Sequence, residues 1–136
     1  MEYITRTLNI STHQEDEMVN VYSSIETILK ESGIISGEIT LFVPHTTAAI
    51  TINENADPDV KKDMLYGLSK AFPKEEAFQH FQGNSHAHIK SSVIGVNQTV
   101  LVEKNAMVLG TWQGIYFMEF DGPRTRKLIV RISGIK

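Results

Sequence analysis

The sequence predicts an α+β fold, in which a largely antiparallel sheet carries two main helices packed on one face. The chain has 136 residues, 41% of them hydrophobic, which fits one globular domain spanning residues 1–136. Two segments repeat apolar residues at helical spacing, and strand candidates dominate the C-terminal half. The strand candidates are joined by short connections, which favour antiparallel pairing because parallel strands need long crossovers.

The N-terminal part is predicted to hold a strand followed by a helix. Residues 3–10 alternate apolar and polar side chains, as a half-buried strand does. Thr12 and Glu15 have the spacing of a capping box, so a helix is expected to begin there and to end at Gly33. Its apolar face would comprise Met18, Val21, Tyr22, Ile25, Ile28 and Leu29.

The middle of the chain reads as strands followed by a second helix. Residues 36–52 are rich in β-branched side chains and predict two strands or one long bent strand. Asp57 as N-cap and Pro58 as first helical residue then mark a helix start. Pro73 ends this helix, and the polar residues 74–86 predict a loop. The apolar stripe of the helix would be Val60, Met64, Leu65, Leu68 and Phe72.

The last third is predicted to be mostly strand. Periodicity leaves residues 88–94 open between a short helix and a strand. Three strand candidates follow, at residues 98–103, 113–121 and 125–133. The turn sequence Asp-Gly-Pro-Arg at residues 121–124 separates the last two, so we expect them to form a hairpin.

Composition and charge exclude several classes of protein. Without cysteine, disulfides, thiolate metal sites and cysteine nucleophiles are all excluded. The formal charge is −3 and the longest basic cluster is residues 124–127, which we interpret as a solvated strand end; we therefore expect no nucleic-acid partner. The apolar runs are far shorter than the ~20 residues that span a bilayer, and residues 1–6 do not resemble a signal peptide. We expect a cytoplasmic protein without a membrane partner.

His45 is the first candidate functional residue. An extended strand points it to the same side as Ile39, Leu41 and Val43, and places it at the strand's end, where a pocket can open. Such an imidazole serves as a base, a metal ligand or a hydrogen-bonded core histidine. The sequence leaves these three roles open.

A second polar group, comprising Asn53, Glu54, Asn55 and Asp57, lies between a strand and a helix N-terminus. Helix N-termini attract anions through their free amide groups and the helix dipole, so all four are candidates for binding a substrate. Asp57 also has a structural explanation as the helix cap, and the two asparagines have one as turn formers. Glu54 has no comparable structural explanation, which makes it a candidate for catalysis.

His86, His88 and Lys90 form the third group. In an extended segment the two imidazoles point the same way and can share a metal, whereas on a helix they lie about 200° apart. Catalytic zinc sites use three protein ligands plus water, and His45, His86 and His88 would supply three nitrogens. The sequence therefore allows a metal site made of these three histidines.

The fourth group contains Trp112, which lies between glycines, and Glu119 in the strand that follows. Residues 115–120 are apolar on both faces, so this strand is expected to be central and Glu119 to be buried. A buried carboxylate is costly unless it is paired, protonated or bound to a ligand; the pairing partner would be Arg126 or Arg131. Trp112 is either a packed indole or a platform for a planar ligand.

These segments resemble the YjbQ family, also called the secondary thiamine-phosphate synthase family. The motifs run in the family's order along nearly the whole chain. They are His45–Thr46–Thr47, the segment from Asn53 to Asp59, Gly83–Asn84, the segment from His88 to Ser92, and the segment from Gly110 to Ile115.

The resemblance implies an α+β fold with a largely antiparallel sheet, assembled as a homotrimer. It also implies a weak thiamine-phosphate synthase activity, which joins a pyrimidine methyl diphosphate to a thiazole phosphate with loss of pyrophosphate. The family's motifs carry the positions of His45, Glu54, Asp57, His88, Trp112 and Glu119. Family members do not all place a histidine at the position of His86, which weakens the three-histidine metal site.

The leading hypothesis is therefore a transferase that acts on small phosphorylated molecules. His45 or His88 would act as general acid or base, and Trp112 would stack on the pyrimidine ring. A departing diphosphate needs positive charge or amide donors. Lys90, a divalent metal such as Zn²⁺ or Mg²⁺, and the free amides after Asp57 would supply them.

Two alternatives stay open. In the first, His45, His86 and His88 hold zinc in a hydrolase, and Glu54 or Glu119 activates the bound water. In the second, the protein is not an enzyme and binds a metabolite or a metal. Turnover of the pyrimidine and thiazole substrates distinguishes the transferase from a binding protein.

Overall fold

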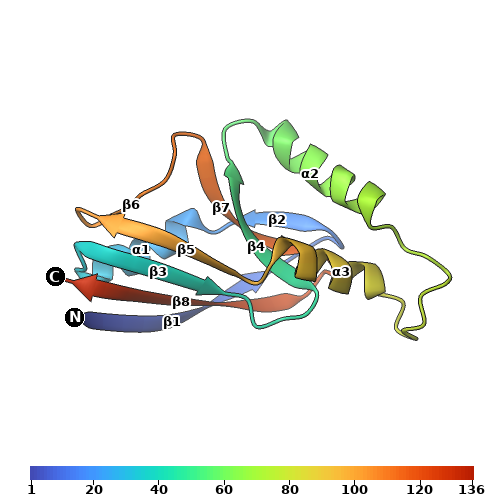
Figure 1. Cartoon of the computed structure of the whole chain (residues 1–136), viewed down its shortest axis with the longest axis horizontal. Helices are drawn as coiled ribbons and strands as arrows, with labels where there is room; N and C mark the ends of the chain where they lie inside the picture. The colour runs from blue at the N-terminus through green and yellow to red at the C-terminus, as the bar shows by residue number, and fades with distance from the viewer.

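The computed structural model describes residues 1–136 and arranges them as two antiparallel sheets and three helices (Figure 1). The five-stranded sheet has the order β1-β8-β3-β5-β6, and the three-stranded sheet has the order β2-β7-β4. The strands are β1 Glu2–Ser11, β2 Glu17–Asn20, β3 Ser36–Phe42, β4 Ala48–Glu54, β5 Asn97–Glu103, β6 Ala106–Met107, β7 Gln113–Glu119 and β8 Thr125–Ile135. The helices are α1 Tyr22–Ser32, α2 Pro58–Ala71 and α3 Ser85–Ile94. The predicted α+β class and antiparallel pairing are confirmed.

Helix α1 begins at Tyr22, well after the predicted start near Thr12. The intervening residues form β2, in which Met18 pairs with Met118 of β7. Thr12 does not cap a helix, because its hydroxyl donates to Glu119 instead. Gly33, with φ of 70°, ends α1 in the left-handed conformation, as predicted.

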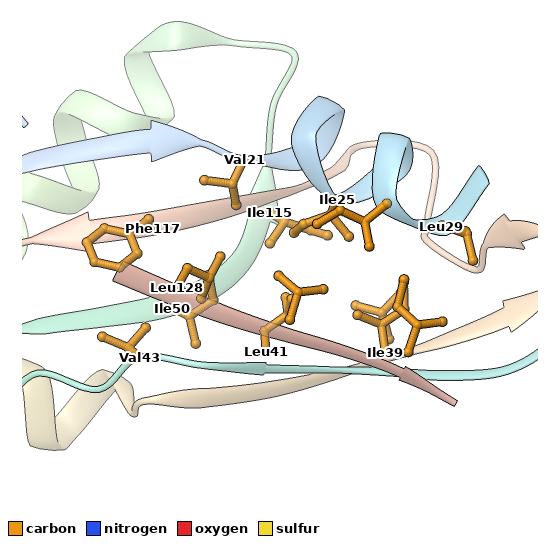
Figure 2. Packing of buried hydrophobic residues seen from close by; sticks show 14 of the residues in the cluster. Val21, Ile25, Leu29, Ile39, Leu41, Val43, Ile50, Ile115, Phe117 and Leu128 are labelled. Atoms are coloured by element: carbon orange, nitrogen blue, oxygen red, sulfur yellow. The ribbon is translucent and has the colours of Figure 1, made fainter. Parts of the chain in front are cut away.

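The main hydrophobic core lies between the two sheets and is closed by α1 (Figure 2). Ile25 and Leu29 of α1 are fully buried there. Ile115 and Phe117, on one face of β7, pack in the same cluster. Strand alternation therefore directs one face of each sheet toward this core.

Helices α2 and α3 cover the opposite face of the three-stranded sheet. Tyr116 and Met118, on that face of β7, pack with Ala87 of α3 and with Met64 and Leu68 of α2. The two main helices, α1 and α2, thus lie on opposite faces of this small sheet and not on one face as predicted. The physical reason is that β7 is apolar on both faces, so each face needs a cover.

Two further predictions are corrected or decided by the structure. Strands β7 and β8 lie in different sheets and form no hairpin, because β7 pairs with β2 and β4 while β8 pairs with β1 and β3. Residues 88–94 belong to helix α3. None of the three helices has the length and apolar character that crossing a bilayer requires.

Candidate functional site

His45 and His88 lie on the wall shared by two adjoining cavities of about 650 Å³ and 480 Å³. His45 comes from the loop between β3 and β4, and His88 comes from α3. Helix α3 is held against β4 by the buried Ala87 and by Ser91, whose hydroxyl donates to the carbonyl of Ala48 at 2.6 Å. The expectation that the two histidines line one cavity is confirmed, and their role in a functional site stays a prediction.

The two cavities have different linings, and we call them the mixed lobe and the polar lobe. The mixed lobe is the larger, and Phe42, Val43 and Val96 provide its apolar wall. The polar lobe has no hydrophobic residue in its wall and includes two guanidinium groups, those of Arg124 and Arg126. A ligand spanning both lobes would have its middle beside the two histidines.

The ring of His45 is held so that it can donate a hydrogen bond to a ligand in the cavity. Its Nε2 accepts a hydrogen bond from the backbone N–H of Lys127 at 2.9 Å. A neutral imidazole has one accepting nitrogen, so Nδ1 carries the proton and is left to donate to a ligand. Burial, and then the positive charge of Arg126, lower the pKa of His45, which keeps the ring neutral near pH 7. With Nε2 occupied, His45 lacks a lone pair for a metal or for a substrate proton.

His88 differs from His45, because neither of its ring nitrogens is held by another group of the chain. It is half-buried, and its ring meets that of His80 edge-on with 5.6 Å between the ring centroids. His80 belongs to the segment between α2 and α3 and also lines the polar lobe. A half-buried imidazole with free nitrogens on a cavity wall is suited to proton transfer, which favours His88 over His45 as the acid or base.

Beneath the polar lobe, Glu119 and Arg126 form a buried ion pair. Arg126 Nε donates to Glu119 Oε1 at 2.8 Å, and Arg126 Nη2 contacts the other carboxylate oxygen. Thr12 also donates to Oε1 at 2.8 Å. Burial alone would raise the pKa of Glu119, but the hydrogen bonds from Arg126 and Thr12 outweigh it and lower the pKa, so the carboxylate stays ionised. Of the two expected partners, Arg126 is the one that pairs.

The network positions the loop that carries His45. Arg126 Nη2 also donates to the hydroxyl of Thr47 at 2.8 Å, two residues after His45. Glu119 is fully buried and does not line either lobe. Its influence on a ligand therefore passes through Arg126 and the loop.

Sequence reasoning did not place the two arginines of the polar lobe at the cavity. Arg124 Nη2 pairs with Asp121 Oδ2 at 3.0 Å, and Asn84 donates to the same oxygen at 2.8 Å. The sequence predicts a solvated strand end at residues 124–127, whereas Arg126 turns inward and Arg124 borders the site. Strand alternation was the available signal, since Arg126 shares its face with the buried Leu128.

The family described as UPF0047 protein YjbQ-like matches residues 6–135. The chain belongs to the YjbQ family. It is 53% identical over 130 residues to UPF0047 protein YugU of Bacillus subtilis, covering 95% of this chain and 98% of that protein. A UPF0047 protein of Methanocaldococcus jannaschii is 50% identical over 127 residues, covering 93% of this chain and 92% of that protein.

Solved structures of family members have the same fold. A YjbQ/UPF0047 protein of Clostridium acetobutylicum is 48% identical, with a TM-score of 0.92 over 94% of this chain and 99% of that one. A protein of Sulfolobus solfataricus at 32% identity has a TM-score of 0.94 over 98% of both chains. The family resemblance inferred from the motifs is therefore confirmed.

Lys90 and His86, on either side of His88 in helix α3, lie away from the cavity that His45 and His88 line. Lys90 is 1% exposed, and its Nζ donates to Asp16 and to Ser69 at 3.0 Å each. His86 and Lys90 together line a third cavity, separate from the mixed and polar lobes. Because residues two apart on a helix point in nearly opposite directions, α3 separates His86 from His88, and the three-histidine metal site does not assemble. The chain contains no cluster of three or more His, Asp or Glu residues that could hold a metal ion.

The family motif from Asn53 to Asp59 begins at the end of β4 that is far from His45. Ala48 and Glu54 are the two ends of β4, so at ~3.3 Å per residue Glu54 is roughly 20 Å from the His45 loop. Asn55 N–H donates to the carbonyl of Trp112 at 2.9 Å, which joins this motif to the Trp112 loop. Trp112 is 63% exposed and is not a packed indole.

The polar residues of this motif have partly structural roles. Asp57 caps α2 by accepting from Asp59 N–H at 2.9 Å, as predicted. Asn53 accepts from the N–H of Glu54 at 2.7 Å. Within one subunit none of them reaches the cavity of His45 and His88. Ligand binding by Asn53, Glu54, Asn55 and Trp112 stays a prediction.

Proposed function

We propose that the protein is a transferase that acts on small phosphorylated molecules at the cavity of His45 and His88. The reaction is of the thiamine-phosphate synthase type. The thiazole nitrogen forms a bond to the methylene carbon of the pyrimidine substrate, the bond from that carbon to the diphosphate oxygen breaks, and pyrophosphate leaves. The two-lobed cavity, with both histidines on the shared wall, is the observation that carries the proposal.

The contrast between the lobes fits a substrate with a ring at one end and a diphosphate at the other. Phe42 and Val96 offer apolar surface to a ring in the mixed lobe. Arg124 and Arg126 offer guanidinium groups to the diphosphate, although Asp121 and Glu119 balance their charge. Recognition therefore depends on directed donors, and the half-exposed Arg124 is the one free to turn from Asp121 to a phosphate.

The two histidines have different roles in the reaction. His45 donates through Nδ1 to an oxygen of the departing diphosphate, because Nε2 is held by Lys127. His88 has free ring nitrogens and supplies the proton that neutralises the leaving group. The negative charge that develops on the diphosphate thus meets donors already fixed in place.

The residues do not fit a zinc ion held by histidines. The accepting nitrogen of His45 is occupied, and His86 lies in another cavity. Magnesium usually reaches such sites on the phosphates of the substrate and needs only one or two carboxylates from the protein. A divalent metal is thus proposed as a companion of the diphosphate, and the zinc hydrolase has no support in the positions of the histidines.

Replacement of Arg124 tests both the reaction and the role of the polar lobe. The wild-type protein is expected to release pyrophosphate when given the pyrimidine methyl diphosphate and the thiazole phosphate. Arg124→Gln should raise KM for the diphosphate substrate about tenfold, because a half-exposed site loses one charge-assisted hydrogen bond. Arg6→Gln, an exposed arginine on β1, is the matched control and should leave KM unchanged. Binding of both substrates without any release of pyrophosphate would instead favour the non-enzymatic alternative.

We also propose that the protein assembles as a homotrimer. Phe42 of β3 and Leu101 of β5 lie on the outer face of the five-stranded sheet, where they are 44% and 57% exposed. Strand β1 leaves one edge of that sheet unpaired, and association is one way to protect such an edge. Light scattering at micromolar concentration should return three times the chain mass of 15.3 kDa. A monomer or dimer mass would contradict the trimer.

A further inference from the structure

A second polar cavity of about 300 Å³ lies between α2, α3 and the loop that precedes β2. It is separate from the lobes that His45 and His88 line. Its polar wall includes Glu15, Asp16, Lys74, His86 and Lys90. Phe72 and Pro73, at the end of α2, add apolar surface.

His86 and Asp16, which line this cavity, have buried polar atoms without hydrogen-bond partners. His86 is 4% exposed, and neither ring nitrogen has a hydrogen-bond partner. Oδ1 of Asp16 is also buried and unpaired. Unpaired buried polar atoms are costly, so two side chains that line one cavity and leave such atoms unpaired point to a ligand that pairs with them.

Two of the unpaired atoms, His86 Nδ1 and Asp16 Oδ1, are acceptors. Nε2 of His86 lies 3.5 Å from Oε1 of Glu15, which favours the tautomer with the proton on Nε2 and leaves Nδ1 as an acceptor. Asp16 Oδ1 is a second acceptor, and the carboxylate of Glu15 provides a third. Three acceptors around one cavity match the three N–H donors of a primary ammonium group.

The two lysines explain how charge is balanced there. The buried Lys90 is fixed on Asp16 and Ser69. Lys74, with a side chain 63% exposed, pairs with Glu15 at 2.7 Å and can leave for solvent at little cost. If a ligand cation replaced Lys74, two carboxylates would face two ammonium groups, and the cavity would stay neutral.

We propose that this cavity binds the primary ammonium group of a small alkylamine. The ammonium donates to Glu15, Asp16 and His86, the alkyl stem contacts Phe72 and Pro73, and Lys74 gives up its place on Glu15. A divalent metal does not fit as well, because both carboxylates already carry lysine ammonium groups and no three-ligand cluster forms.

Calorimetric titration with propylammonium chloride, in phosphate buffer free of other amines, tests the proposal. The full-length protein should bind propylammonium and should not bind tetramethylammonium, which has the same charge but no N–H donor. Lys74→Ala should tighten binding roughly two- to fivefold, because it removes the resident competitor from an exposed pair. Glu15→Gln should weaken binding about tenfold, because it removes a charged acceptor.

The variants are chosen so that folding is preserved. Glu15 and Lys74 are both half-exposed or more, and the exposed Glu75→Gln serves as matched control with unchanged affinity. Equal binding of the two ammonium ions, or an affinity that Lys74→Ala does not raise, would overturn the proposal. So would electron density showing only water between Asp16 and His86 in crystals soaked with propylammonium.

Discussion

Glu119→Gln is expected to lower the free energy of unfolding by about 3–5 kcal/mol, the range for breaking one side of a buried ion pair. Both carboxylate oxygens accept hydrogen bonds: Oε1 from Thr12 and Arg126 Nε, and Oε2 from the N–H of Asp121 and from Arg126 Nη2. Whichever way the amide turns, its NH₂ group faces donors, and the buried guanidinium loses its counter-charge. For a chain of this length the melting temperature should fall by roughly 10–20 °C, measured by differential scanning calorimetry.

Two further variants show whether the loss of stability comes from breaking the ion pair between Glu119 and Arg126. Glu103→Gln, on the exposed side of β5, should leave the melting temperature unchanged. The double variant Glu119→Leu with Arg126→Met should recover much of the loss, because it removes both charges and leaves neither buried alone. A Glu119→Gln protein that melts within a degree of wild type but loses all turnover would show that Glu119 serves the ligand directly and not through Arg126.

The sequence predicted the local elements better than their packing. The strand at residues 3–10, the cap at Asp57 and the helix end at Gly33 each follow from a pattern within a few residues. The early start predicted for α1 failed because Thr12 and Glu15 imitate a capping box, while tertiary pairing with β7 draws the following residues into β2. Local propensity is overridden where a neighbouring strand offers a full set of hydrogen bonds.

The two-sheet arrangement could not be predicted from adjacent strands. The turn at residues 121–124 suggested a hairpin, but both edges of β7 are already taken by β2 and β4. The chain therefore crosses to the other sheet, where β8 pairs with β1 and β3. Which edges are free depends on pairings between residues 59 to 132 positions apart, and no local pattern carries that information.

The candidate site was predicted in part. Strand parity and the family resemblance brought His45 and His88 together, although they are far apart in sequence. The same reasoning grouped Lys90 with them, because Lys90 lies only two residues from His88 in the sequence. On α3 the helical period instead directs Lys90 and His86 to a second cavity. The polar lobe was missed because a run of basic residues is typical of a solvated strand end, whereas strand alternation directs Arg126 to the face of the buried Leu128.

His88→Gln is expected to lower kcat for pyrophosphate release by about 10²–10⁴-fold, the usual contribution of a general acid or base. Glutamine retains a polar group of similar reach but cannot transfer a proton near neutral pH. KM should change little, because Arg124 and His45 would still bind the diphosphate. The protein should stay folded, since no hydrogen bond of the chain depends on the His88 ring.

Comparison with two other histidines separates proton transfer from simple loss of an imidazole. His13→Gln alters an exposed histidine outside both lobes and should leave kcat unchanged. His45→Asn, whose amide NH₂ can take the place of Nδ1–H, should retain more activity than His45→Gln, whose amide takes the place of Nε2. The assignment of His88 as the general acid or base depends on its free ring nitrogens and on the occupied Nε2 of His45. It would be wrong if His88→Gln kept kcat within threefold of wild type, because no other half-buried imidazole with free nitrogens lines both lobes.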